Sequence, residues 1–181
     1  MSNFNKALEK IRSKSSNTVE QGTAFEKLSK IYFENDDVQK QEFNKIWHYK
    51  DWAKENTNFS KTDIGIDLVG ELGDGSGLAA IQCKFFNQTH QITKEDLDSF
   101  VSAASNKIFT RLVLIDTSNE DLGSNAKSMI DNLDKTYQRI QKYDLENSRI
   151  NWIEYIENEK VSLSKKKEKL KRLKNHLILW Y

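Results

Sequence analysis

The 181 residues of this chain are enough for one domain with a substantial core, and too few for two ordinary domains. A formal net charge of +1 excludes a uniformly basic nucleic-acid coat, so any contact with DNA has to use local patches. The single cysteine, Cys83, excludes an internal disulfide and a cysteine-based zinc site. Because no apolar run approaches the roughly 20 residues that cross a bilayer, we expect a cytoplasmic protein without membrane contact.

The amino-terminal part of the sequence predicts two helices and then a strand. Residues 1–14 form a charged segment whose apolar side chains recur at helical spacing. A second helix is predicted to start at Asn17 or Thr18, either of which can cap its first turn, and to end near Asn35. The aromatic run at residues 43–49 favours a strand.

The best-defined β signal is a hairpin made of residues 64–71 and 78–86. Both segments are rich in β-branched and other apolar residues, and they are joined by a glycine-rich link. The pair Asp74-Gly75 in that link suits a tight turn.

The remaining sequence predicts alternating helices and strands. Thr93 can cap a helix, and the unbroken apolar run 112–115 is typical of a strand covered on both faces. A helix around residues 125–133 and a last strand at 150–156 follow. The order strand, helix, strand predicts that the strand at 112–115 runs parallel to a neighbour in the same sheet. The basic segment from residue 163 onward predicts a helix beyond the compact core.

A polar cluster lies within the otherwise apolar hairpin. Side chains alternate along a strand, so Gln82 and Lys84 emerge on one face and Cys83 turns to the other. Antiparallel pairing can bring Asp67, on the preceding strand, across from Gln82 and Lys84. The sequence therefore predicts one site that contains a carboxylate, an amide and an amine.

These groups need a compensating partner, because burying them unpaired costs several kcal/mol. A hard divalent cation such as Mg²⁺ suits Asp67, and Gln82 and the backbone carbonyl of Cys83 can add oxygen ligands. A protonated Lys84 cannot bind a metal, but it can hold an attacking water or offset charge on a phosphate. The set is suited to hydrolysis of a phosphodiester bond.

The residues of this cluster resemble a known family of nucleases. The stretches "GIDLV" and "AIQCK" follow the pattern of the PD-(D/E)xK superfamily, and the glutamine variant is similar to its Mrr-like branch. The wider run from residue 18 to residue 160 resembles the amino-terminal nuclease domain of type ISP restriction-modification enzymes. This resemblance implies an α/β, restriction-endonuclease-like fold with a mixed central sheet of four or five strands flanked by helices. Residues 1–160 would form the nuclease domain, with residues 1–17 as a helical extension, and residues 161–181 would lead to a following domain.

The resemblance also assigns roles to individual residues. Asp67 corresponds to the principal metal ligand, Gln82 to the second ligand position and Lys84 to the catalytic lysine. Glu26 matches an acidic residue on the first core helix that completes the metal shell or orients a water, and Asp63 has a supporting position. Because Gln82 contributes no negative charge, metal binding is expected to be weaker than with glutamate.

The implied activity is Mg²⁺-dependent cleavage of double-stranded DNA, with Mn²⁺ as a possible substitute. The implied partners are translocase, methyltransferase and target-recognition domains of the same full-length chain, and a transiently paired second nuclease domain. Asn106, Lys107 and Lys127 are candidates to line the DNA path, and the basic helix can contact DNA or, as we prefer, a neighbouring domain. Two alternatives stay open: a catalytically silent DNA-binding or docking module, and a nuclease for branched or single-stranded DNA.

Overall fold

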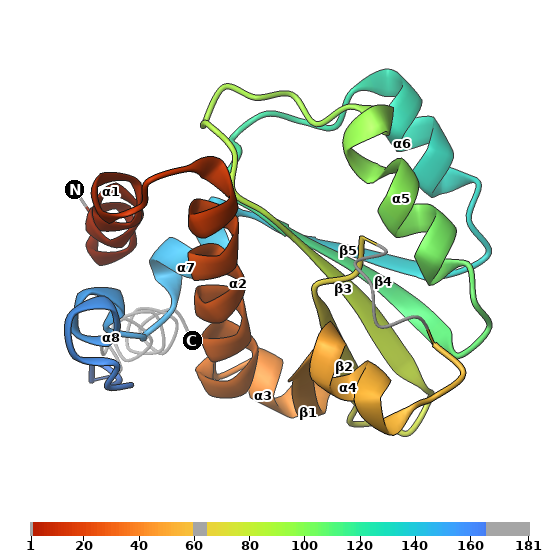
Figure 1. The fold of residues 1–181 in the computed structure, drawn as a ribbon, viewed down its shortest axis with the longest axis horizontal. Coiled ribbons are helices and arrows are strands. Elements are labelled where there is room, and N and C mark those ends of the chain that lie inside the picture. Colours follow the sequence, from red (N-terminus) through yellow and green to blue (C-terminus); the bar gives the residue numbers. More distant parts are fainter. Residues whose placement is uncertain (1, 60–64, 166–181) are drawn as a thin grey trace, which may run out of the picture.

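A computed structural model describes residues 2–59 and 65–165 of the chain, and a five-stranded sheet forms its centre (Figure 1). The strands lie in the order in which they occur along the chain, β1-β2-β3-β4-β5. β2 runs antiparallel to both of its neighbours, β1 and β3, whereas β3, β4 and β5 are parallel, which confirms the predicted mixed sheet. The strands are β1 Phe43–His48, β2 Leu68–Leu72, β3 Leu78–Lys84, β4 Phe109–Asp116 and β5 Thr136–Ile140.

Helices cover both faces of this sheet (Figure 1). One face packs against α1, α2, α7 and α8, and the other packs against α4, α5 and α6. The short helix α3 joins α2 to β1. The helices are α1 Asn3–Lys14, α2 Thr18–Asn35, α3 Gln39–Glu42, α4 Tyr49–Glu55, α5 Lys94–Ala104, α6 Ser124–Asp131, α7 Lys142–Asn147 and α8 Trp152–Asn158.

The first two helices form as the sequence predicts. The side chain of Asn17 caps α2 by accepting a hydrogen bond from the backbone N–H of Glu20. Both helices bury their apolar stripe in the core on the same face of the sheet, where Phe4 and Phe25 are fully buried. This packing places the amino-terminal turns of α2 beside the end of β3, as the contact between the rings of Phe25 and Phe85 shows.

The β2–β3 hairpin and the connection that follows it also agree with the prediction. Asp74 accepts hydrogen bonds from the backbone and side chain of Ser76, and Gly75 has a positive φ of 75°, so the turn forms where the Asp-Gly pair predicts it. A capping box formed by Thr93 and Asp96 starts α5, which connects β3 to the parallel strand β4. No side chain from residue 112 to residue 116 exposes surface, as expected for a strand covered on both faces.

The prediction of a last strand at residues 150–156 is wrong. This segment forms α8, which begins after Asn151, whose side chain accepts a hydrogen bond from the backbone N–H of Glu154. Trp152 is buried, and its ring packs 5.2 Å from the ring of Phe4 on α1. The apolar residues of this segment fit helical spacing as well as alternation, and contact with α1 selects the helix.

The fifth strand instead comes from residues 136–140, for which no strand was predicted. This edge strand contains several polar residues and buries only Ile140 among its side chains, so it has no apolar alternation to reveal it. Its place in the sheet depends on pairing with β4.

Smaller differences concern the ends of elements. Tyr49 starts α4 instead of ending β1, and β2 begins at Leu68, so Asp67 lies just before the strand. Residue 163 makes an isolated antiparallel bridge to Ile150, and the predicted basic helix beyond residue 165 lies outside the described residues. Within the described ranges, no helix has the length and apolar character needed to span a membrane.

Candidate active site

Asp67 is held between two neighbouring segments of the fold. Its backbone N–H donates to the carbonyl of Ile81 on β3 at 3.0 Å, and its carbonyl accepts from the N–H of Tyr49 on α4 at 2.9 Å. Its Oδ2 accepts a hydrogen bond of 2.6 Å from the backbone N–H of Cys83. The carboxylate is therefore fixed against the carboxyl-terminal end of β3.

Gly65 allows the segment before Asp67 to approach α5. Gly65 has a φ of 87°, and a Cβ at this position would lie 2.7 Å from the backbone nitrogen of Phe100. Only glycine combines this backbone conformation with such close contact, so the glycine of "GIDLV" helps to position the aspartate two residues later.

Gln82 lies between the two residues of β3 that bind Asp67. The β2–β3 register ends with Leu68 paired with Ile81, and beyond it Asp67 bonds to the carbonyl of Ile81 and to the N–H of Cys83. Gln82 is 4% exposed, and its Oε1 has no hydrogen-bond partner among the described residues. A buried polar atom without a partner is costly, so this oxygen is suited to receive a ligand.

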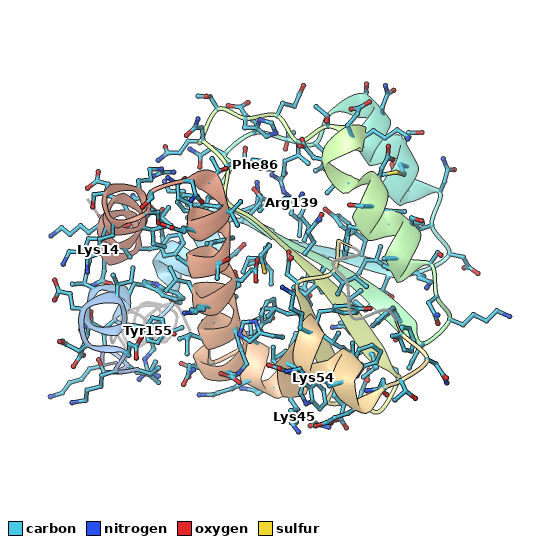
Figure 2. All side chains as sticks on the ribbon, in the orientation of Figure 1. Lys14, Lys45, Lys54, Phe86, Arg139 and Tyr155 are labelled. Atoms are coloured by element: carbon cyan, nitrogen blue, oxygen red, sulfur yellow. The ribbon has the colours of Figure 1, made fainter. Side chains whose placement is uncertain are left out.

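Lys84 is two residues beyond Gln82 and therefore on the same face of β3. It is half-buried, and within residues 2–59 and 65–165 it forms no ion pair. Its Nζ lies 6.0 Å from the ring centroid of Phe86, just beyond the end of β3 (Figure 2). The amine is thus not locked in a salt bridge away from Asp67.

A cleft of about 600 Å³ opens between α2 and α4 and contains Asp67 together with Glu26 of α2. Its lining also includes three lysines, one from α2 and two from α4, namely Lys27, Lys50 and Lys54. Figure 2 labels Lys54 on α4. The cleft thus combines carboxylates with lysines, of which Lys54 is bound to Asp51 in the same lining. A larger groove between α1 and α8, of about 930 Å³, contains none of the predicted catalytic residues.

Cys83 is turned away from this face, as strand alternation predicts. Burial, followed by the charge of Asp67, raises the pKa of its thiol well above the ordinary value, and a hydrogen bond with Ser29 of α2 opposes this shift. The thiol therefore stays protonated and is unsuited to act as a nucleophile. The backbone of Cys83 serves the site instead. Its N–H donates to Asp67, and its carbonyl points to the same side of the strand, toward the segment that contains Asp67.

His48 also lines the cleft, although its sequence context predicts no catalytic role. It ends β1 and pairs with Leu68, directly after Asp67. Burial, and then the charge of Lys30, lower the pKa of the imidazole, so that it is neutral at pH 7. Its position could have been found only from the β1–β2 register, which the sequence does not specify.

The structure does not bring all predicted residues together. Asn106 and Lys107 precede β4, at the end of the β3–β4 ladder opposite to Gln82 and Lys84. Lys127 of α6 lines a separate pocket near Arg139. A role for these three residues in DNA contact stays a prediction, and Asp63 lies outside the described residues.

The residues present fit a divalent cation with oxygen ligands. In the part of the chain that the structure describes, no three His, Cys, Asp or Glu side chains gather as a metal-binding group. The fit depends instead on the unpartnered Gln82 Oε1 and on the Asp67 carboxylate, which is bound to the N–H of the next residue, Cys83. Mg²⁺ accepts such a mixed set, because it commonly binds through one or two carboxylates and completes its shell with water and substrate oxygens.

The mixed sheet and this hairpin site define the chain as a restriction-endonuclease-like protein. A family model described as restriction endonuclease, of the Mrr type, matches residues 34–162, and the chain belongs to this family. The predicted fold class and family are thereby confirmed. A search of curated proteins gave no significant match.

Two solved structures are similar to the chain. The ATP-dependent type ISP restriction-modification enzyme LlaBIII, bound to DNA, superposes with a TM-score of 0.67 and 29% sequence identity over 88% of this chain. The chain spans only 10% of that enzyme's length. The restriction endonuclease MspJI, in complex with a 27-mer oligonucleotide, has a TM-score of 0.36 and 17% identity over 73% of this chain and 31% of its own, which is too low to support an inference.

Proposed function

We propose that this chain is a metal-dependent endonuclease domain that hydrolyses phosphodiester bonds of duplex DNA. We further propose that it is the cleavage module of a larger ATP-dependent restriction-modification enzyme, with translocase, methyltransferase and target-recognition domains in the same full-length chain. The observation that carries the proposal is that Asp67 is hydrogen-bonded to Ile81 and Cys83, the two neighbours of Gln82 on β3, and that the buried Oε1 of Gln82 has no partner among the described residues. Membership of the restriction endonuclease family supports it.

Asp67, Gln82 and the backbone carbonyl of Cys83 would hold a Mg²⁺ ion, for which Mn²⁺ is a possible substitute. When bound, such an ion lowers the pKa of a coordinated water and offsets charge on the phosphate. Glu26 shares the cleft with Asp67 and would complete the metal shell or orient the water. Asp63 would support the site from the segment before Gly65.

Lys84 would stabilise the negative charge that develops during the reaction. A protonated amine can donate hydrogen bonds to the attacking hydroxide or to a non-bridging phosphate oxygen. Since Lys84 makes no ion pair with a described carboxylate, no existing salt bridge has to be broken before it can act. Its half-buried position strengthens the interaction, because fewer water molecules screen the charge.

Nicking of supercoiled plasmid in the presence of Mg²⁺ tests the proposed function. Asp67→Asn keeps the shape of the side chain and an oxygen for the Cys83 N–H, but removes the charge that a metal requires. We expect it to lower the cleavage rate by about 100-fold or more, a typical consequence of losing an electrostatic contact in the transition state. Asp51→Asn is the matched control, because Asp51 lines the same cleft but is bound to Lys54 at 2.7 Å.

Equal cleavage by the wild type and Asp67→Asn would contradict the assignment of the site. Binding of duplex DNA without any Mg²⁺-dependent cleavage would instead identify a catalytically silent module. Linear, nicked and four-way-junction substrates are compared in the same assay, and a clear preference for the junction would show that branched DNA is the substrate.

A further inference from the structure

Gly22 lies in the interior of α2, and nothing in the described part of the chain requires a glycine there. Its φ is not positive, and a Cβ built at this position meets no atom within 4 Å. Glycine in a helix is less favourable than alanine, because it loses more conformational freedom on folding. Neither backbone conformation nor packing within the described residues therefore explains its presence.

Gly22 faces the cleft that contains Asp67 and Glu26. It lies one turn before Glu26 on α2, and both residues line this cleft. Val19 and Thr23 line the same wall, and Val19 is 76% exposed. The side chains on this face of α2, which is made of Val19, Gly22 and Thr23, are short and uncharged. We call it the low face, and it lines the same cleft as Glu26 and Asp67.

The surroundings of this face suit a sugar–phosphate backbone. Lys27 flanks it on α2, and Lys50 lies on the opposite wall on α4, where Lys54 is bound to Asp51. Lysines attract phosphates, whereas an uncharged face allows the sugars to approach closely. The exposed Val19, one turn before Gly22, adds apolar surface with only a short side chain.

We propose that Gly22 is a positioning residue for DNA: the absence of a side chain lets the backbone of the strand to be cut lie directly on α2, at the depth that brings a phosphate to Asp67. The inference rests on the proposed function for the identity of the ligand. It adds the place where the strand lies and the residue that sets its distance from the site.

Two substitutions of increasing size test this inference. Gly22→Ala and Gly22→Leu add side chains to the low face, and Gln21→Leu is the matched control, because Gln21 is adjacent on α2 but does not line the cleft. Three quantities are compared with wild type: the melting temperature, the dissociation constant for a short fluorescent duplex in Ca²⁺, and kcat and KM for plasmid nicking in Mg²⁺.

We expect Gly22→Ala to melt at or above the wild-type temperature, because alanine favours the helix. Its dissociation constant and KM should rise by about tenfold, and those of Gly22→Leu should rise further, because the added atoms occupy the space of the strand. The value of kcat should change less than KM. Gln21→Leu should bind and cut like the wild type.

Wild-type binding and KM in both Gly22 variants would overturn the inference. A lower melting temperature for Gly22→Ala would also overturn it, because the added methyl group would then collide with the protein itself. These measurements distinguish a failure of the role proposed for Gly22 from a failure of the proposed nuclease function. If the wild type binds duplex but never cuts it, the nuclease proposal fails, and the binding constants still decide the role of Gly22. A wild type that does not bind duplex overturns both.

Discussion

Gln82 gives the candidate site its distinctive chemistry at the scale of single residues. The commoner pattern of the superfamily has a carboxylate at this position, and the amide lowers the negative charge beside Asp67. A buried second carboxylate would repel Asp67 in the absence of metal, whereas the amide tolerates burial better. The glutamine is therefore expected to favour stability without metal at the expense of affinity for metal.

Gln82→Glu should reverse this balance. Without metal, the variant should melt below the wild type, because it places a second carboxylate at a buried position next to Cys83, whose N–H binds Asp67. Mg²⁺ should raise its melting temperature by more than that of the wild type, because tighter binding to the folded state stabilises it more. Scanning fluorimetry over a range of Mg²⁺ concentrations measures both effects.

Gln82→Leu is the control for this prediction, because it has similar size but no oxygen. It should keep its stability without metal and lose the shift caused by Mg²⁺. Identical Mg²⁺ responses of all three proteins would show that the side chain of residue 82 does not contact the ion.

Strand alternation predicted the placement of part of the candidate site from sequence. It placed Gln82 and Lys84 on one face of β3 and turned the Cys83 side chain to the other. Asp67 lies just before β2 and is bound to the Cys83 N–H, a contact that the predicted hairpin brings within reach. His48 and Gly22 were not given a role, because their contribution depends on how β1 and α2 are placed against the hairpin. Such placement is decided by contacts between segments that are distant in sequence.

At the scale of elements, an ion pair fixes the ends of β4 and β5 beside the site. Asp116 is fully buried and accepts hydrogen bonds from Nε and Nη2 of Arg139 at 2.8 and 3.1 Å. Arg139 Nη2 also donates to the carbonyl of Glu120, so the pair holds the loop after β4. That loop in turn binds the end of β3, where the Thr117 N–H donates to the carbonyl of Lys84.

Arg139→Gln should destabilise the protein by about 3–5 kcal/mol at pH 7, because it leaves the Asp116 carboxylate buried without its counter-charge. Burial already raises the pKa of Asp116 above its ordinary value of 3.8. A raised pKa means that the folded state binds the proton more readily than the unfolded state, so protonation relieves the penalty. The loss in free energy of unfolding relative to the wild type should therefore become smaller as the pH falls from 7 toward about 4. Urea unfolding at several pH values measures it.

Arg149→Gln provides the comparison for this prediction. Arg149 pairs with the partly exposed Asp37 at 2.8 Å, so Arg149→Gln should lower the free energy of unfolding by much less. Equal losses in the two variants, or a deficit of Arg139→Gln that does not change with pH, would contradict the role given to the buried pair.

The elements that the sequence predicted correctly are those with a local signal. Asn17 and Thr93 cap their helices, and Asp74 forms its turn, through contacts within a few residues. The assignment failed at α8 and β5, where local pattern is ambiguous. The contact of Trp152 with Phe4 and the pairing of β5 with β4 join segments far apart in the chain.

At the scale of the whole molecule, the order of the strands gathers the site from separate parts of the chain. Asp67 and Gln82 come from the central hairpin, Glu26 from a helix on one face, and the lysines of α4 from the segment after the edge strand β1. The five-stranded sheet holds these parts together. The cleft between α2 and α4 is then the place where a bound DNA strand would meet the proposed metal ligands.

Anomalous diffraction from a crystal of the protein soaked in Mn²⁺ tests the central claim most directly. A divalent ion at the candidate site should give a peak within about 2.0–2.4 Å of an Asp67 oxygen and of Gln82 Oε1, the distances at which hard cations bind oxygen ligands. A crystal with Mn²⁺ bound only elsewhere, or with no peak between Asp67 and Gln82 at saturating Mn²⁺, would contradict the account.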